Sequence, residues 1–450
     1  MSERGGGETN RLTGRVSRYA RVGASVGRVA ARMGAERLFG LQTDNAEAAA
    51  ALRAALGGLK GPLMKVAQLL ATIPDALPAE YAGELAQLQS NAPSMGWPFV
   101  RRRMTSELGP DWQRKFKSFE REAAAAASLG QVHRAIGHDG RKLACKLQYP
   151  DMQSAVEADL NQLRIIFAVY RRYDRAIDPS RIHDEIAARL REELDYDREA
   201  RHQSLYRIML KNEELVRVPE VVPELSTRRL LTMDWMAGEP LMHFKSRSLD
   251  ERGKLAMAMF RAWYVPFYGY GVIHGDPHLG NYKVMPDMSV NLLDFGCVRV
   301  FHSKFVKGVI DLYHALERDD RELAVHAYET WGFTGLKNEV IDTLNLWAEF
   351  IYAPLLDDKP RAIHDEGSMY GARVASKVHA RLRELGGVTV PREFVFMDRA
   401  AIGLGSVFMH LEAQVNWHRL FKELIEGFDE GKLARRQAAA MAKVGLDPPE

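Results

Sequence analysis

Two short polar segments constrain this chain more than any other feature of its sequence. The first is HGDPHLGN, from His274 to Asn281, and the second is DFG, from Asp294 to Gly296. Between them, a turn is flanked by two apolar pieces, Tyr282 to Met285 and Val290 to Leu293, and this pattern predicts a β-hairpin. Because a hairpin folds the chain back on itself, we expect the two polar segments to lie close together.

Three oxygen-bearing side chains in these segments have the chemistry of a magnesium and phosphate site. Hard divalent cations prefer carboxylate and amide oxygens, so Asn281 and Asp294 are the predicted metal ligands. Asp276 lies beside the rigid Pro277 and is the predicted group that accepts a proton from a hydroxyl or orients a water. HGD and DFG each occur by chance in turns. At this spacing, and on either side of a predicted hairpin, we interpret them as one site.

A lysine on a predicted strand supplies the positive charge that such a site needs. The segment LACKLQYP alternates, which places Lys146 with Ala144 and Gln148 on one face. The apolar residues of the opposite face are Leu143, Cys145 and Leu147. A strand lysine is ordinarily an exposed edge residue. A phosphate site, however, requires one cation on a rigid strand and a helix glutamate to position it.

The acidic segment REELDYDREA is expected to provide that glutamate. It contains Glu193, Asp195 and Glu199, within a helical span predicted from Ala155 to Met209 and broken near Asp178. Acidic residues on a helix usually form a solvated surface. We nevertheless predict Glu199 as the partner of Lys146.

An alanine-rich segment, EAAAAASLGQVH, precedes the lysine strand and runs from Glu122 to His133. An alanine run is more often plain helix, but Ser128, Leu129 and Gly130 follow it, which favours a turn that faces a phosphate. Alanine restricts φ more than glycine does, so we expect altered nucleotide geometry here. The predicted nucleotide contacts of this segment are Ala125, Ala126, Ala127 and Ser128.

Together these motifs resemble the UbiB/AarF family of atypical protein-kinase-like ATPases, which is associated with ubiquinone biosynthesis and lipid homeostasis. The resemblance covers the alanine-rich loop, the strand lysine, an ExD segment at Glu193 and Asp195, the HGDPHLGN loop and DFG, from about residue 50 to beyond 300. The intervals of five and thirteen residues from Asp276 to Asn281 to Asp294 also match those of protein-kinase catalytic loops.

The resemblance implies ATP and Mg²⁺ as cofactors. Lys146 would bind the α and β phosphates, Glu199 would hold Lys146, and Asp276 would be the catalytic base. Met233 and Asp234 would reach the adenine, at the end of a strand predicted from Leu230 to Met236. Isoprenoid lipids, quinone precursors and quinone-biosynthesis proteins are the partners that the family implies.

The family also carries a KxGQ signature on an N-terminal helix that folds over the active site and restricts access of protein substrates. Here the matching residues are Lys65 and Gln68, with Ala67 in place of the glycine. Residues at i and i+3 share one helix face, so both side chains would point at the acidic Glu193 and Asp195. The resemblance implies a regulatory role for these four polar residues.

The implied fold is α+β: a two-lobed, mostly helical protein-kinase-like fold with an N-terminal helical extension over the active-site cleft. The expected divisions are a basic helical segment at 1–45, a helical extension carrying the KxxQ motif at 46–110, a small lobe at 111–236 and a helical large lobe with the catalytic and metal loops at 237–450.

Composition excludes several other classes of protein. Lys and Arg total 62 against 59 Asp and Glu, so the net charge of +3 does not indicate a nucleic-acid partner. The two cysteines lack the spacing of a disulfide framework or a metal site. The longest uncharged stretch, Ala262 to Ile273, is too short to span a membrane, and the first residues lack the apolar core of a secretory signal. We therefore expect a cytoplasmic protein.

A basic stripe near the N-terminus qualifies that expectation. Six arginines between Arg11 and Arg32 fall within an arc of roughly 140° on a helix. The stripe is either a solvated helix face or a peripheral contact with the anionic inner face of a membrane.

Two other functions remain open from the sequence alone. One is a small-molecule kinase of the aminoglycoside or choline type, which also carries an HGDxxxxN loop; the alanine-rich turn and the Lys65 helix argue against it. The other is a non-catalytic scaffold that binds a nucleotide or a lipid, and the presence of both metal ligands favours catalysis over it.

Overall fold

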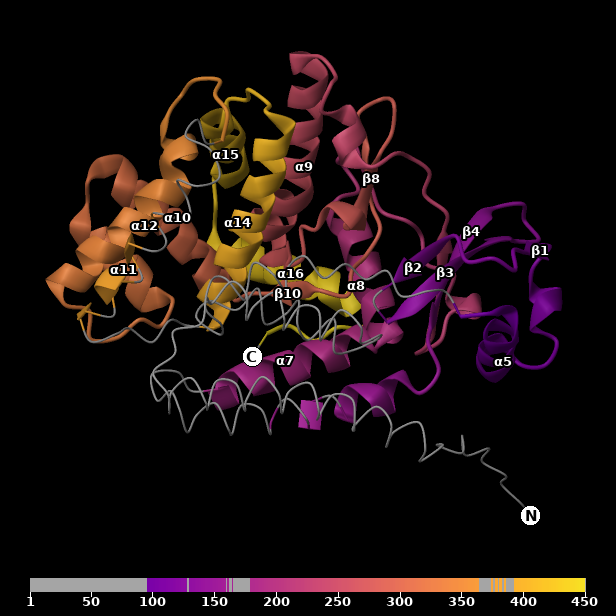
Figure 1. The fold of residues 1–450 in the computed structure, drawn as a ribbon. Helices are drawn as coiled ribbons and strands as arrows, with labels where there is room; N and C mark the ends of the chain where they lie inside the picture. The colour runs from indigo at the N-terminus through magenta and orange to yellow at the C-terminus, as the bar shows by residue number, and fades with distance from the viewer. Residues whose placement is uncertain are drawn as a thin grey trace, which may run out of the picture. The chain divides into compact units, whose positions relative to one another are not determined.

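The computed structural model describes residues 95–127, 129–158, 179–363 and 392–449, with a few isolated positions between these ranges (Figure 1). The chain divides into two compact units. The larger unit comprises Trp97–Ala124, Val132–Leu147 and Asp195–Glu450. The described part of the smaller unit lies mainly within Ala125–Gln131 and Gln148–Leu194. The fold is mixed α+β with small sheets, as predicted.

The largest sheet contains the strand that bears Lys146. Its strand order is β1-β3-β4-β6, and β2 pairs with β3. The strands are β1 (Ser118–Phe119), β2 (Ala125–Ala127), β3 (Gly130–Ile136), β4 (Lys142–Gln148) and β6 (Leu230–Asp234). In the antiparallel pair β4 and β6, Lys146 lies opposite Leu231. The strand predicted at Leu230 is confirmed, although it ends two residues earlier than the predicted Met236.

Two different cores cover the faces of β4, as the alternation predicted. Leu143, Cys145 and Leu147 pack with residues of helix α5 (Trp97–Leu108) and with Trp112. Ala144, on the other face, packs with Tyr196 and residues of β6. The helices beside the sheet are α5 (Trp97–Leu108), η1 (Trp112–Lys115) and η2 (Pro223–Leu225). Because both faces are covered, Lys146 is a buried residue and not an exposed edge lysine.

The helical span predicted to continue to Met209 is in fact two helices. These are α7 (Pro179–Glu193) and α8 (Tyr196–Met209), separated by Leu194 and Asp195. The Asp195 carboxylate accepts a hydrogen bond of 3.1 Å from the Arg198 N–H and so caps α8. This extra break corrects the prediction. An aspartate followed by acidic residues in the first turn is the local signal for it.

The described part of the smaller unit has an apolar core of its own. Residues 152–158 are helical. Met152 and Val156 pack in a cluster with Leu190 of α7 and with Leu129. At the surface of the same unit, Arg191 Nε lies 2.7 Å from Glu157 Oε1. These contacts join α7 to the helical segment that follows β4.

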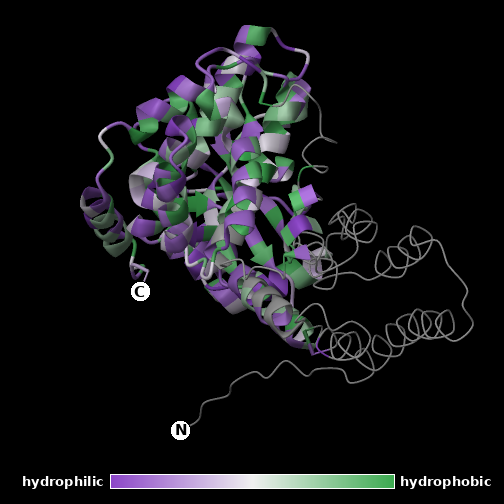
Figure 2. Ribbon diagram, turned by 90° about the vertical axis from the view of Figure 1, so that its left-hand side faces the viewer, coloured by the Kyte–Doolittle hydropathy of each residue, from purple (hydrophilic) through white to green (hydrophobic). Residues whose placement is uncertain are grey.

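Beyond β6 the larger unit is mainly helical. Its elements are η3 (Leu241–Phe244), α9 (Leu249–Tyr270), α10 (Ser303–Arg318), α11 (Arg321–Thr330), α12 (Asn338–Leu356), α14 (Arg392–Leu411), α15 (Trp417–Ile425) and α16 (Glu430–Lys443). Helix α9 contacts α8, α10, α14, α15 and α16, so it forms the centre of this part (Figure 1). Many of its helices carry hydrophobic and hydrophilic residues on different faces (Figure 2).

Helix α9 has well-defined ends, and its C-terminus places the next strand. Ser248 and Glu251 form a reciprocal capping box at its start. Gly271 ends it with φ of 65°, and a Cβ there would lie 2.8 Å from the Phe301 carbonyl oxygen. Only glycine fits this conformation and this close approach.

Short strands hold the predicted catalytic and metal loops. β7 (Val272–His274) pairs with β10 (Val298–Val300), and β5 (Val216–Arg217) runs parallel to β9 (Val290–Leu292). The predicted hairpin is confirmed: β8 (Tyr282–Val284) and β9 (Val290–Leu292) are antiparallel. The short helix η4 (Leu279–Asn281) precedes β8.

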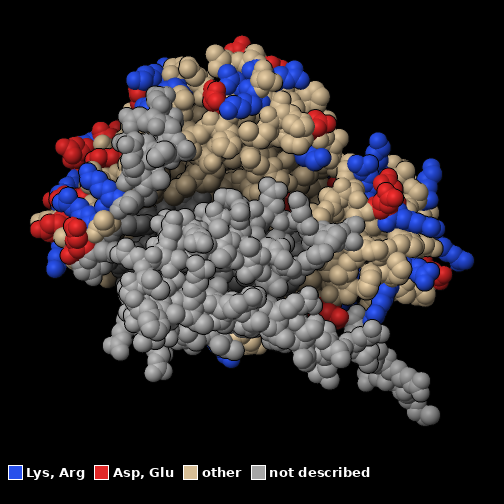
Figure 3. Space-filling model, in the orientation of Figure 1, with Lys and Arg blue, Asp and Glu red and all other residues tan. Residues whose placement is uncertain are grey.

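The visible surface of the molecule differs from one part to another. Lys and Arg side chains gather over the region of α5, β1 and β4, and another group of charged side chains lies at the top of the view (Figure 3). Within the described ranges, no helix combines the length and the apolar character needed to cross a bilayer. The Arg11 to Arg32 stripe, Lys65, Gln68 and Ser128 lie outside the described residues.

Candidate functional site

Lys146, near the end of β4, lies between two carboxylates. Its Nζ atom donates to Glu199 Oε1 at 2.7 Å, to Glu199 Oε2 at 2.9 Å and to Asp294 Oδ2 at 2.9 Å. The Tyr196 ring centroid lies 5.2 Å from the same nitrogen. The Glu199 side chain is 3% exposed and that of Asp294 is 38% exposed. The structure thus brings together a strand, helix α8 and the DFG segment around one ammonium group.

The electrostatics of this trio follow from burial and proximity. Burial disfavours the lysine ammonium, but the Asp294 and Glu199 carboxylates more than offset it and hold the pKa of Lys146 well above its usual value. Burial also disfavours the Asp294 carboxylate, yet the Lys146 ammonium holds the pKa of that carboxyl well below its usual range. Burial raises the pKa of Glu199, against the opposing effect of Lys146. With all three groups ionised, the trio carries one excess negative charge.

Asp195 positions Glu199 through the start of helix α8. The cap formed by the Asp195 side chain fixes where the helix begins, and the Glu199 N–H donates to the Asp195 carbonyl at 3.1 Å. Glu199 therefore faces Lys146 from the first full turn of the helix. Glu193 is the last residue of α7 and belongs to the smaller unit. The regulatory role predicted for Glu193 and Asp195 stays a prediction.

The catalytic-loop residues Asp276 and Asn281 are in direct contact. Asn281 Nδ2 donates to Asp276 Oδ2 and to the Asp276 carbonyl oxygen, each at 3.0 Å. The Leu293 N–H donates to the Asn281 carbonyl at 2.8 Å, which continues the pairing of the β8–β9 hairpin. Asn281 is therefore across the hairpin from the residue that precedes Asp294. This is the proximity that the hairpin pattern predicted.

His274 connects the catalytic loop to the DFG segment. Its Nδ1 accepts a hydrogen bond of 3.2 Å from the Asp276 N–H, so its Nε2 carries the proton and donates to the Asp294 carbonyl oxygen at 2.6 Å. The ring is buried and packs near Phe295. A neutral histidine in this tautomer fixes the backbone at both acidic residues.

Oxygen atoms suited to a magnesium ion are present in the loop and in the DFG segment. Asp294 Oδ1 accepts from the Gly296 N–H at 3.0 Å, and Asn281 Oδ1 remains after the Asn281 amide nitrogen has bonded to Asp276. Among the described residues, no group of three His, Cys, Asp or Glu side chains could hold a metal. Magnesium commonly takes only one or two protein oxygens and completes its shell with water and phosphate, so the donor set fits it.

The residues predicted to reach adenine differ in their exposure. Met233 is buried beside Ala144 and Tyr196 on the same face of the sheet as Lys146. The Asp234 carboxylate accepts from the Glu220 N–H at 3.0 Å and lies 3.6 Å from Arg141. The side chain of Asp234 is therefore engaged with protein groups.

The alanine-rich segment has a different local structure from the one predicted. Ala125–Ala127 form strand β2, which pairs with β3, so these three residues are extended and do not form the turn itself. A short alanine run without helix caps leaves backbone N–H and C=O groups without partners. Here the pairing with β3 supplies hydrogen bonds to these groups. Leu129 lies in a turn, and Ser128 lies outside the described residues. Ala125 and Ala126 are exposed.

Sequence reasoning missed several residues that support the site. The sequence predicts no separate role for His274, Tyr196 or Tyr206. Tyr206 packs 5.2 Å from the Phe295 ring. His202 is buried beside the DFG backbone, and burial lowers its pKa to about 3, so it is neutral. Tyr196 and His202 flank Glu199 at helical spacing on α8, which is the only sequence signal that could have found them.

Comparisons with known proteins agree with this geometry. Residues 87–327 match the model of the ABC1 atypical kinase-like domain. The chain is 31% identical over 278 residues to the chloroplastic protein Activity of bc1 complex kinase 7 of Arabidopsis thaliana, covering 61% of this chain and 40% of that protein. It is 26% identical over 370 residues to the mitochondrial atypical kinase COQ8 of Saccharomyces cerevisiae, covering 81% of this chain and 74% of COQ8.

A solved structure shows the same fold. It is that of Rv3197 from Mycobacterium tuberculosis in complex with erythromycin, with a TM-score of 0.61 and 26% identity. The similarity covers 85% of this chain and 96% of that one. The family match spans more than half of the chain and includes the lysine strand, helix α8, the catalytic loop and DFG. The chain therefore belongs to the UbiB/AarF family of atypical kinase-like proteins.

Proposed function

We propose that this protein binds ATP with Mg²⁺ at the site around Lys146 and Asp294 and turns it over. The observation that carries the proposal is the position of the Lys146 ammonium. It lies between the buried carboxylate of Glu199 on helix α8 and the partly exposed carboxylate of Asp294 in the DFG segment. A phosphate site needs a cation fixed on a rigid element, and Glu199 keeps this one in place. The excess negative charge of the trio is suited to a neighbouring divalent cation.

Each residue has a role that its surroundings support. Lys146 would donate to the α and β phosphates, and Asn281 and Asp294 would hold Mg²⁺ through their side-chain oxygens. The metal ion neutralises charge on the phosphates. Asp276, oriented by Asn281 and by the His274 ring, takes the proton of an attacking hydroxyl or positions a water. The acceptor of the phosphoryl group is therefore a hydroxyl-bearing substrate or water.

Removal of the metal should abolish nucleotide binding. With Mg²⁺ present and ATP at about 100 times its Kd, the full chain should gain about 2.7 kcal/mol of stability, seen as a higher melting temperature. Excess EDTA should remove most of this gain, because Asn281 and Asp294 then have no cation to share with the phosphates. Thermal melting and release of inorganic phosphate are the two measurements. Equal melting with and without ATP and Mg²⁺ would contradict the proposed site.

For the biological role, we propose support of isoprenoid quinone biosynthesis or lipid homeostasis, with peripheral contact to an anionic membrane through the Arg11 to Arg32 stripe. Both the mitochondrial relative COQ8 and the family resemblance support this role. A deletion strain should contain less isoprenoid quinone, and the full chain should restore it. A chain without residues 1–40 should restore less. Normal quinone content in the deletion strain would count against the role, and full rescue by the shortened chain would count against the membrane contact.

A further inference from the structure

Helix α14 contains two glycines, Gly403 and Gly405, in its interior. Glycine is less favourable than alanine inside a helix, because its backbone loses more conformational freedom on folding. Residues two positions apart on an α-helix are separated by about 200° around the axis, so the two glycines face nearly opposite directions. Each glycine therefore has to be explained by its own surroundings.

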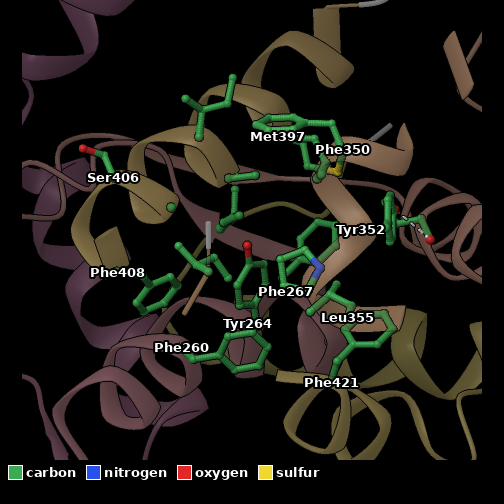
Figure 4. A pocket seen from close by; sticks show the side chains of 18 of the residues that line it. Phe260, Tyr264, Phe267, Phe350, Tyr352, Leu355, Met397, Ser406, Phe408 and Phe421 are labelled. Atoms are coloured by element: carbon green, nitrogen blue, oxygen red, sulfur yellow. Dashed lines mark hydrogen bonds between the residues drawn. The ribbon is translucent and has the colours of Figure 1, made fainter. Parts of the chain in front are cut away.

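Gly405 faces an apolar cavity of about 430 Å³ that is lined by residues of α9, α12 and α14. Phe408 of α14 and Phe260 of α9 lie on its wall, with their ring centroids 6.5 Å apart (Figure 4). A Cβ built on Gly405 would meet no atom of the described residues within 4 Å. A methyl group at this position would therefore enter open space and displace nothing around it.

Gly403, in contrast, lies against the catalytic loop. A Cβ built on it would be 2.5 Å from Pro277 Cγ, 3.4 Å from Cδ and 3.8 Å from Cβ of the same ring. Ordinary van der Waals contact begins at 3.4 Å, so a methyl group here would force α14 and the loop about 1 Å apart. The Pro277 ring cannot swing its Cγ away, because it is closed onto its own main chain. Only a residue without a side chain permits this approach.

Pro277 directly follows Asp276, and the loop around both residues is held from the side of β7 and β8. The Asp276 N–H donates to His274 Nδ1 at 3.2 Å. The hydroxyl of Tyr282, which is 1% exposed, donates to the Pro277 carbonyl oxygen at 3.4 Å. Helix α14 contacts the same loop through the proline ring. Because the ring fixes φ of Pro277, a displacement of the ring displaces the main chain beside Asp276.

We propose that Gly403 is a positioning residue for Asp276. Its lack of a side chain lets Pro277 pack directly against α14, and this contact sets the place of the Asp276 carboxylate. The nucleotide would be held by Lys146 and Asp294, which belong to other elements of the site. The contact with α14 therefore governs the step in which Asp276 acts and not the affinity for ATP. This inference rests on the proposed function.

The test compares Gly403→Ala with Gly405→Ala in the full chain, because both variants gain the same methyl group and the same helix propensity in one helix. Gly403→Ala should lower kcat for Mg²⁺-dependent phosphate release at least about tenfold, since a misplacement of about 1 Å can cost about 100-fold. Its KM for ATP should stay within about twofold of wild type. Gly405→Ala should keep both constants within about twofold. Equal kcat values in the two variants would overturn the inference.

A second substitution tests whether the proline ring transmits the effect. Pro277→Ala removes Cγ and Cδ and leaves only a Cβ, which would lie at the ordinary contact distance of 3.8 Å from the new methyl group. Alone, Pro277→Ala should lower kcat less than about fivefold, through the lost rigidity of the loop. Added to Gly403→Ala, it should raise kcat to the value of Pro277→Ala alone. If the two losses multiply instead, the two positions act independently and the inference fails.

Two further measurements separate the possible causes of a lost rate. A lower melting temperature of Gly403→Ala together with a raised KM for ATP would show general damage to the fold, which would contradict a positioning role. Normal turnover in the wild-type chain with equal kcat in both alanine variants would refute the role of Gly403 and keep the proposed function. Absence of turnover in the wild-type chain would refute the proposed function and the role of Gly403 with it.

Discussion

Asp294→Asn is expected to lower Mg²⁺-dependent ATP turnover at least about 100-fold, which corresponds to ~2.7 kcal/mol in the activation barrier. Asparagine keeps the shape of the side chain but removes the charge that holds the metal and pairs with Lys146. The measurement is the initial rate of phosphate release at saturating ATP and Mg²⁺, with wild-type protein beside the variant.

The same substitution should not unfold the protein. Lys146 and Glu199 would remain as a neutral pair, since the variant removes the one excess negative charge of the trio. We therefore expect a melting temperature equal to or above that of the wild type. A loss of turnover together with lower stability would mean that Asp294 is structural, which would contradict the role assigned to it.

Asp287→Asn is the matched control. Asp287 lies in the turn of the same β8–β9 hairpin, where its side chain is 57% exposed and pairs with Arg217 at 3.0 Å. It receives the same chemical change at a position away from the lysine. Turnover in this variant should stay within about twofold of wild type. A comparable loss in both variants would show that the hairpin, and not the metal ligand, accounts for the effect.

The central geometry could be predicted because it depends on local patterns. The alternation around Lys146 predicted which face of the strand it occupies, and the turn from Pro286 to Ser289 predicted the hairpin that returns Asp294 to Asn281. Glu199 was predicted as the lysine partner because a phosphate site of this kind needs a helix glutamate to position its lysine. Periodicity alone did not distinguish it from the other acids of its segment.

Other features depended on contacts that the sequence does not show. The helix break at Asp195 was missed because a capping aspartate within an acidic run resembles a solvated helix surface. The strand at Ala125–Ala127 was predicted as a turn because the residues that follow it favour one, and the pairing with β3 that makes it a strand is a contact that the sequence does not show. The cavity near Gly405 was invisible for a different reason: apolar periodicity predicts which residues face inward but not whether they fill the space between helices.

The largest expected effect on stability is that of Lys146→Met. Glu199 is 3% exposed, and removal of the lysine leaves its carboxylate buried without a cation and close to Asp294. Breaking a buried ion pair from one side typically costs about 3–5 kcal/mol. We expect a loss of this size in the free energy of unfolding at pH 8, measured by urea titration, together with loss of ATP binding.

The cost should depend on pH, and the sign follows from the raised pKa of Glu199. In the folded variant this carboxyl keeps its proton to a higher pH than in the unfolded chain, since burial is no longer opposed by the ammonium. Between the pKa of Glu199 in the unfolded chain and its higher pKa in the folded variant, the folded state therefore binds more protons than the unfolded state. The free energy of unfolding falls as the pH rises through this range. The loss caused by Lys146→Met should be smaller at pH 5 than at pH 8.

A second substitution separates charge from packing. Glu199→Gln in the Lys146→Met background removes the unpaired carboxylate, so the double variant should be more stable at pH 8 than Lys146→Met alone, and its stability should lose the pH dependence. The comparison is a double-mutant cycle, with the half-exposed pair Arg191 and Glu157 as the matched control, whose coupling should be much smaller. If the double variant were no more stable than Lys146→Met, the buried carboxylate would not be the cause. The lysine would then contribute by packing, and the electrostatic account of the trio would fail.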